Sequence, residues 1–432
     1  MKKIMMMLAL ACAGSSFAAA DVKVRAERKS AVYKAGETVK FNVSGPLDAV
    51  KGFAVSDDAK NIKFAPLTSN VIEFKAEKPG FVLVTLDLGK NEKGKKVFAY
   101  GGAAVEPEKI VPGTKAPADF AEFWHKEVAK MRESKLEVVK KEAIDAKYLP
   151  AGFEAYDVEV RRGDVTVTGY LVMPEKSAKG SLAAVLNFNG ASKVSAELPV
   201  ATAPAKANGA ISFNVNFHGL KNVNLTRKRN LEAEAKMRPL VKNYQWDNAE
   251  NAQQYAMRKI FLRVVLAADF LKSVPEFDGK TLIAAGGSLG GCQAIVCAAL
   301  VPEVVLCISN ATAMCDHFGK DAGHLPGWPN LLKRNPKAAA AAAYFDVVNF
   351  ARMVKCPTRM AVGFIDVTCP PATTYAAYNV LGCADKKMAH TVTGGHGSCW
   401  DKKELGVFSQ HMRNIKKFIR SYQSGKGLPA GI

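Results

Sequence analysis

Residues 281–291 have the sequence TLIAAGGSLGG, which joins an apolar run to a glycine-flanked serine. The run from Thr281 to Ala285 predicts a short buried strand, and the small residues after the motif predict a helix. The Gly-x-Ser-x-Gly pattern places Ser288 at the turn between them. Flanking glycines let the backbone turn sharply, so the serine stands exposed above the carboxyl edge of the sheet. The stretch therefore predicts a nucleophilic serine on a strand–turn–helix unit.

Two candidate partners of this serine follow it in an informative order. Asp366 ends the apolar strand predicted for Arg359 to Ile365, and His396 lies in the glycine-rich loop Gly394 to Gly397, just past the last predicted strand. Ser, then Asp, then His, each at the end of a successive strand, is the order found in α/β-hydrolases. We therefore expect Ser288, Asp366 and His396 to form a catalytic triad, with the imidazole as general base.

The oxyanion hole is expected from two backbone N–H groups. One belongs to Leu289, directly after the serine. The other belongs to Ala191, in the loop that follows the strand predicted for Ala183 to Phe188, where Gly190 allows a close approach. The start of the helix behind Ser288 adds a field that favours negative charge. Each donor is expected to stabilise the transition state by about 3–4 kcal/mol.

Strands alternate with helices over residues 117–432, which predicts an α/β fold with a doubly wound, mostly parallel sheet, the α/β-hydrolase architecture. An amphipathic helix is expected from Asp119 onward, opened by a capping-box-like pattern. Further elements are predicted as strands at 165–172, 210–217 and 388–392 and as helices at 248–273 and 404–422.

Residues 21–105 have a different pattern, with short runs of alternating apolar and polar residues separated by glycines. This pattern predicts a small all-β, immunoglobulin-like sandwich domain. Residues 106–116 are expected to be a stiff, proline-containing linker to the catalytic domain at 117–432. The small domain could bind glycan, pack against a neighbouring subunit or act as a spacer, and the sequence does not choose among these roles.

The first 20 residues have the features of a secretory signal peptide. Two lysines precede the apolar stretch Ile4 to Ala13, and Ala18 to Ala20 supplies the small residues of a cleavage site. Neither this stretch nor any later apolar run reaches the roughly 18–20 residues that span a bilayer, so no transmembrane segment is expected. We expect cleavage before Asp21 and export to the periplasm or the extracellular space. Cys12 loosely fits a lipoprotein box, but its apolar run is too short to favour lipid anchoring.

The composition excludes several classes of protein. The chain has 432 residues, 48% of them hydrophobic and 23% charged, which excludes a mainly disordered or collagen-like protein. Lys and Arg exceed Asp and Glu by 60 to 40, but the densest basic clusters, Lys90 to Lys96 and Arg227 to Arg229, are short and lack interleaved aromatics. A nucleic-acid partner is therefore not expected. The basic surface is either simply solvated or attracted to acidic polysaccharide or an anionic envelope.

The cysteines and histidines are not spaced along the sequence as in common metal-binding motifs. Neither a C-x-x-C pair nor an H-E-x-x-H helix occurs, so no metal and no cofactor is expected. Export permits disulfides. Four cysteines in predicted loops are candidates for pairing, with the connectivity open: Cys315, Cys369, Cys383 and Cys399.

The sequence resembles the acetyl xylan esterase and cephalosporin-C deacetylase family, carbohydrate esterase family 7, over about 112–422. The resembling segments are PADFAEFW at 117–124, GGSLGG at 286–291, Tyr344-Phe345-Asp346 with Asn349, and GFIDVTCPP at 363–371. The last is the most specific, because the acid residue, the cysteine and the double proline recur together in that family.

This resemblance implies a serine esterase that removes O-acetyl groups from an acetylated poly- or oligosaccharide of the xylan type. It also implies that Ser288, Asp366 and His396 are the triad, with Ala191 and Leu289 at the oxyanion hole. The region before the catalytic domain is similar to the extra N-terminal domain of some secreted bacterial members.

The chain departs from the family pattern at four points. Leu289 stands where the family usually has Gln, and Ala191 stands where it usually has Tyr, so the acyl pocket is expected to differ. His218-Gly219-Leu220 replaces an Arg-Gly-Gln element, and Gly397 replaces the Glu of a His-Glu pair. The paired loss of Arg and Glu is consistent with a lost supporting ion pair.

Three residues are candidates for the substrate pocket: His218, Trp328 and Trp400. The two tryptophans are suited to stacking on a sugar ring, with core packing as the alternative. Two other functions stay open: an α/β-hydrolase acting on another ester or a peptide, and a non-catalytic envelope glycan-binding protein on a hydrolase scaffold. The oligomeric state is also open, with a homo-oligomer as one alternative.

Overall fold

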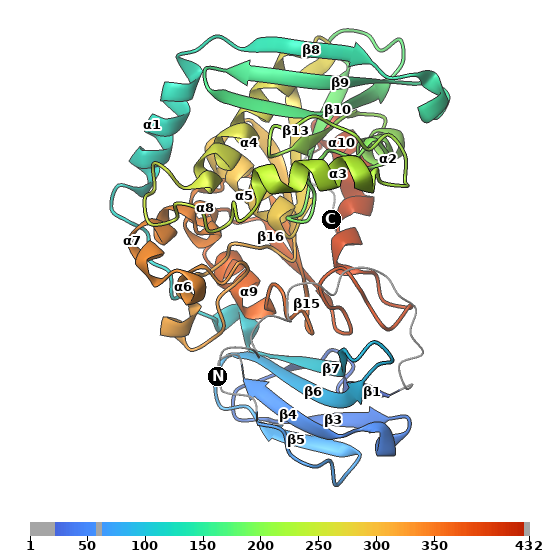
Figure 1. Cartoon of the computed structure of the whole chain (residues 1–432), viewed down its shortest axis with the longest axis vertical. Coiled ribbons are helices and arrows are strands. Elements are labelled where there is room, and N and C mark those ends of the chain that lie inside the picture. Colours follow the sequence, from blue (N-terminus) through green and yellow to red (C-terminus); the bar gives the residue numbers. More distant parts are fainter. Residues whose placement is uncertain (1–21, 58–62, 427–432) are drawn as a thin grey trace.

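The structure is a computed structural model that describes residues 22–57 and 63–426. The predicted signal peptide and Cys12 therefore lie outside the described residues. Figure 1 shows an α/β body, built around one large sheet, with a separate group of strands packed against one end of it.

The large sheet has nine strands in the order β16-β15-β14-β13-β11-β12-β10-β9-β8. The six from β16 to β12 are parallel, and β10, β9 and β8 continue the sheet in antiparallel pairing. The strands are β8 (Glu137–Ala143), β9 (Phe153–Arg162), β10 (Val165–Pro174), β11 (Leu182–Phe188), β12 (Ile211–Asn216), β13 (Phe277–Gly287), β14 (Val304–Asn310), β15 (Thr358–Gly363) and β16 (Lys386–Thr391).

The helices of the body are α1 (Phe120–Arg132), α2 (Leu198–Asn208), α3 (Leu231–Met237), α4 (Ala256–Ser273), α5 (Leu289–Leu300), α6 (Leu331–Arg334), α7 (Ala339–Ala342), α8 (Val347–Met353), α9 (Pro371–Asn379) and α10 (Ile415–Gln423). Across residues 22–57 and 63–426, none of them combines the length and the apolar character that a bilayer crossing requires.

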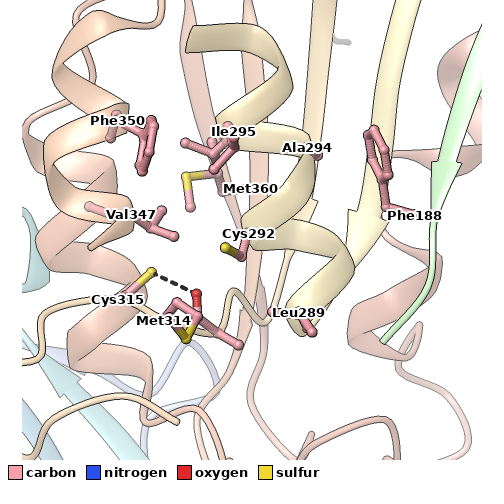
Figure 2. Packing of buried hydrophobic residues seen from close by; sticks show 14 of the residues in the cluster. Phe188, Leu289, Cys292, Ala294, Ile295, Met314, Cys315, Val347, Phe350 and Met360 are labelled. Carbon is pink, nitrogen blue, oxygen red and sulfur yellow. Dashed lines mark hydrogen bonds between the residues drawn. The ribbon is translucent and has the colours of Figure 1, made fainter. Parts of the chain in front are cut away.

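The sheet is doubly wound, because helices cover both of its faces and alternate residues of the central strands point into different layers. On β11, Ala184 and Leu186 belong to the main core, beneath α1, α4, α5 and α8. Ala183 and Val185 point the other way, into a second cluster beneath Phe418 of α10. The pleat thus buries both faces of the strand, as parallel strands require. Figure 2 shows the main core between α5 and α8.

Two predicted helices are wrong in length. The helix expected at 248–273 begins only at Ala256, because Tyr255 has a non-helical backbone (ψ 127°). The helix expected at 404–422 is reduced to α10, and His411 before it adopts a left-handed conformation (φ 62°) that an α-helix does not continue through.

The strands between residues 23 and 105 form two further sheets, with the orders β1-β3-β5 and β2-β7-β6-β4. Their facing side chains, including Phe41 and Leu86, are buried together. The strands are β1 (Lys23–Ala26), β2 (Val32–Tyr33), β3 (Thr38–Ser44), β4 (Gly52–Asp57), β5 (Val71–Lys75), β6 (Gly80–Lys90) and β7 (Lys96–Val105). We call residues 23–105 the N-terminal β region.

The segment between this region and the body is held by buried carboxylates. Asp316 accepts hydrogen bonds from the backbone N–H groups of Gly113 (3.0 Å) and Thr114 (2.7 Å). Asp346 accepts one from the hydroxyl of Thr114 (2.7 Å). Buried carboxylates need hydrogen-bond donors, and here the segment supplies them. These bonds fix the C-terminal end of the predicted linker to the body.

Candidate active site

Ser288 occupies a strained turn between β13 and α5. Its backbone has φ 58° and ψ −126°, a conformation that costs free energy for a non-glycine residue. The N–H of Ser288 donates to the carbonyl of Asn310 at 2.9 Å, which fixes the turn against β14. Gly290 allows the helix to approach the sheet, because a Cβ there would collide with the carbonyl oxygen of Phe188. The glycines around the serine thus permit a close approach of helix and strand.

His396 joins the serine to an aspartate. Its Nε2 lies 2.9 Å from Ser288 Oγ, and its Nδ1 lies 2.7 Å from Asp366 Oδ2. The other oxygen of the buried Asp366 accepts the N–H groups of Thr368 and Cys369 at 2.8 and 2.9 Å. An ionised carboxylate accepts all these hydrogen bonds, which orients the imidazole with Nε2 facing the serine. The structure therefore brings the three predicted residues into one hydrogen-bonded chain.

The acid and histidine loops are neighbours because β15 and β16 pair in parallel. After the strands end, Ile365 N–H still donates to Gly394 O at 3.1 Å. Gly394 also forms an isolated antiparallel β-bridge with Cys399, and Gly395 N–H donates to Ser398 O at 2.8 Å. His396 therefore lies at the tip of a tight turn whose base is fixed to the acid loop.

The loop expected to supply the second oxyanion donor lies beside Ser288. A Cβ on Gly190 would be 3.7 Å from Ser288 Cβ. The buried amide of Gln293 donates to Asn189 O and to Leu289 O, both at 3.1 Å. One side chain thus joins the segment before Ala191 to the turn that carries the Leu289 N–H.

Two supporting residues at this loop were missed by the sequence analysis. Gln293 carried a weak signal, as a polar residue one helical turn after Leu289 in an apolar helix. Tyr244 carried none, because it lies in an irregular segment far along the chain. Its hydroxyl donates to Ala191 O at 3.3 Å, and burial raises its pKa, so it stays a donor.

His218 lies behind the loop that carries Ala191, with Tyr244 between them. Its ring packs against Tyr244, with the centroids 4.7 Å apart, and its Nε2 is buried without a hydrogen-bond partner. Burial, with a smaller contribution from the charge of Arg263, lowers the pKa of His218 to about 3. The ring is therefore neutral near pH 7.

This burial predicts an acid-sensitive fold. The unfolded chain protonates His218 near pH 6.5, whereas the folded chain does so only near pH 3. Between these values the unfolded state binds more protons, so the free energy of unfolding falls with falling pH by up to about 1.4 kcal/mol per unit. His218→Leu should flatten the dependence of the urea midpoint on pH between 4 and 6. His125→Leu, at an exposed position on α1, should keep the wild-type slope, and equal slopes in all three proteins would contradict the prediction.

The two candidate tryptophans occupy different surroundings. Trp328 packs against the main core, and its carbonyl accepts the N–H of Met314 at 2.8 Å. Trp400 follows the turn that carries His396, and the guanidinium of Arg25 lies 4.9 Å from its ring centroid. One face of Trp400 is therefore already covered by the N-terminal β region.

The cysteines that were candidates for pairing are not paired. All eight cysteines in the described part of the chain are free thiols, and both Cys315 and Cys369 are buried. Burial raises the pKa of the Cys369 thiol, which lies beside Ser288, well above its usual value. Within the described ranges, no group of three or more His, Cys, Asp or Glu residues is placed to hold a metal ion.

The sheet order, with its two covered faces and the serine turn after β13, is that of the α/β-hydrolases. Residues 107–319 and 330–409 match the family model for acetyl xylan esterase (AXE1), and the chain belongs to this family. It is accordingly a carboxylic ester hydrolase, as the sequence resemblance implied.

Individual relatives agree with this assignment. The chain is 29% identical over 411 residues to a protein named acetyl esterase Axe7A from Xylanibacter ruminicola, covering 90% of this chain and 88% of the relative. An acetyl xylan esterase from Paenibacillus sp. R4 has a similar fold (TM-score 0.59, 21% identity, 72% of this chain and 98% of that one). Acetyl xylan esterase 1 from Thermoanaerobacterium gives a TM-score of 0.54 at 22% identity, with the same coverage of 72% and 98%.

Proposed function

We propose that the protein is an exported serine esterase that removes O-acetyl groups from acetylated carbohydrate of the xylan or xylo-oligosaccharide type. The observation that carries the proposal is the hydrogen-bonded chain Ser288–His396–Asp366, with links of 2.9 and 2.7 Å, in an acetyl xylan esterase fold. The signal-like first 20 residues support export, and we further propose that the N-terminal β region is an immunoglobulin-like sandwich domain.

In the proposed mechanism, His396 Nε2 removes the proton of Ser288 as Oγ attacks the acetyl carbonyl carbon. The N–H groups of Leu289 and Ala191 donate to the oxyanion, and Asp366 stabilises the imidazolium. The imidazolium then gives its proton to the departing sugar oxygen, which leaves an acetyl-serine. A water molecule, deprotonated by His396, attacks this ester and releases acetate.

The arrangement of the supporting groups favours catalysis over binding alone. A non-catalytic glycan-binding scaffold has no need of an aspartate that is hydrogen-bonded to the histidine through one oxygen and to two backbone N–H groups through the other. It also has no need of an amide that joins the segment before Ala191 to the turn after Ser288. The name of the curated relative supports acetyl as the acyl group. Buried Leu289 and Cys369 beside the nucleophile are consistent with a small acyl pocket.

An acyl chain-length series tests the substrate. A closed acetyl pocket should make kcat/KM for p-nitrophenyl acetate at least about 10²-fold higher than for the hexanoate, because each methylene without space loses about 1–3 kcal/mol. The same preparation should release acetate from acetylated xylo-oligosaccharides, measured enzymatically against the Ser288→Ala protein as control. Rapid hydrolysis of the hexanoate, with acetylated xylo-oligosaccharides left intact, would instead indicate another ester or a peptide as substrate.

A further inference from the structure

The N-terminal β region contacts the body directly behind the acid loop. Gly102 of β7 lies so close to Phe364 that a Cβ there would collide with its carbonyl oxygen and come within 2.9 Å of its Cβ. Phe364 directly follows β15 and precedes Asp366 by two residues. The backbone of β7 therefore supports the backbone of the acid loop, with no side chain between them.

An aromatic cluster continues this contact across the boundary. The ring of Phe81, on β6, packs edge-on against Phe364 with centroids 5.3 Å apart and lies 5.7 Å from Tyr375 of α9. Phe364 packs in turn against His390 of β16 at 5.0 Å, and the hydroxyl of Tyr375 is hydrogen-bonded to His390 Nε2. Phe81, Phe364 and Tyr375 are all buried, so this junction is a continuous core.

The N-terminal β region also contacts the histidine loop. Arg25 of β1 forms an ion pair with Asp401, with Nη2 and Oδ2 2.5 Å apart, and its guanidinium covers Trp400. Trp400 and Asp401 donate their N–H groups to the carbonyl and hydroxyl of Thr393, both at 3.3 Å. These bonds join the two ends of the loop that carries His396. Because Arg25 pairs with Asp401 at one of these ends, it helps to fix the position of the loop.

We propose that the N-terminal β region is a structural part of the active site, which positions the acid and histidine loops through Gly102, Phe81 and Arg25. This inference rests on the proposed triad. Asp366 and His396 lie beyond the ends of their strands, and such loops have less support than the sheet. A catalytic group displaced by 1 Å can lose about 10²-fold in rate. Figure 1 shows the strands of the region against the end of the body where β15 finishes.

A charge-reversal pair tests the contact to the histidine loop. Arg25→Asp and Asp401→Arg should each lower kcat for p-nitrophenyl acetate about tenfold with KM within twofold, since this small ester has no sugar chain that a glycan-binding region could hold. The Arg25→Asp/Asp401→Arg double variant should recover most of the lost kcat by restoring the ion pair. Arg28→Asp is the matched control, because Arg28 pairs with Glu37 inside the region and should leave kcat unchanged.

A glycine substitution tests the contact to the acid loop. Gly102→Ala should lower kcat about 10²-fold by displacing Phe364. Gly52→Ala is the control, because its Cβ would press on Ala65 within the N-terminal β region, 3.1 Å from the carbonyl oxygen, and should leave kcat unchanged. Thermal unfolding of each variant identifies proteins that fail to fold. If Gly102→Ala does not fold, the charge-reversal variants alone test the proposal.

The outcomes separate the proposed roles of the region. Loss of kcat on the small ester in the single variants, with rescue in the double variant, supports positioning. Unchanged kcat on p-nitrophenyl acetate with a raised KM on polymeric acetylated xylan would overturn it in favour of glycan binding, and no change on either substrate would indicate a spacer. The positioning variants are compared with the wild-type protein, whereas the triad is tested by Ser288→Ala. A failure of this inference is therefore distinguishable from a failure of the triad.

Discussion

Replacing Ser288 with alanine should lower kcat for acetyl ester hydrolysis by about 10⁴-fold or more, because loss of the nucleophile removes most of the catalysis in serine hydrolases. The buried thiol of Cys369 lies beside Ser288, but its raised pKa keeps it protonated near neutral pH, so it cannot take over the attack. Acetate release and p-nitrophenyl acetate kinetics measure the loss. A fluorophosphonate probe should label the wild-type protein and leave the variant unmodified.

The matched control for this experiment is Ser398→Ala. Ser398 is exposed in the same turn as His396, and only its backbone carbonyl is used there, as the acceptor for Gly395 N–H. This variant should keep the wild-type kcat and the labelling. Equal activity in Ser288→Ala and Ser398→Ala would end the serine esterase proposal.

Asp366→Asn should lower kcat about 10⁴-fold without unfolding the protein. Two backbone N–H groups, of Thr368 and Cys369, fix one side of the Asp366 carboxylate as an acceptor. In the variant the carbonyl oxygen of the amide takes that side, so the NH₂ group faces His396 Nδ1. Nδ1 must then accept, which places the ring proton on Nε2 and leaves nothing to receive the proton of Ser288.

Steady-state kinetics on p-nitrophenyl acetate, together with thermal unfolding, measures this effect. Asp321→Asn is a suitable control, since Asp321 is an exposed carboxylate on a short helical turn and should retain full activity. A kcat of Asp366→Asn within tenfold of wild type would show that Asp366 does not set the tautomer of His396.

The sequence predicted those parts of the molecule whose signals are local. The strand, glycine turn and helix around Ser288 appear as expected, because periodicity and glycine placement are read over a dozen residues. β8 escaped prediction, because most of its side chains are exposed and it lacks an alternating apolar pattern. The helix predicted at 248–273 was too long, because the pattern of apolar residues does not indicate that the backbone of Tyr255 is non-helical.

The supporting contacts of the site were beyond the reach of the sequence. Chain order alone suggested that Ser288, Asp366 and His396 meet, since parallel strands end at one edge. The amide of Gln293 reaches an acceptor 104 positions away, and Arg25 pairs with Asp401 across 376 positions. No local pattern specifies either contact, because each depends on how complete elements pack.

The junction between Phe81 and Phe364 bears on any attempt to shorten this enzyme for practical use. A truncated version limited to the α/β body would expose the rings of Phe364 and Tyr375, which the β strands now cover. Adjacent uncovered aromatics promote self-association. A minimal enzyme would therefore need polar replacements at these two positions, together with a new means of holding the loop that begins at Phe364.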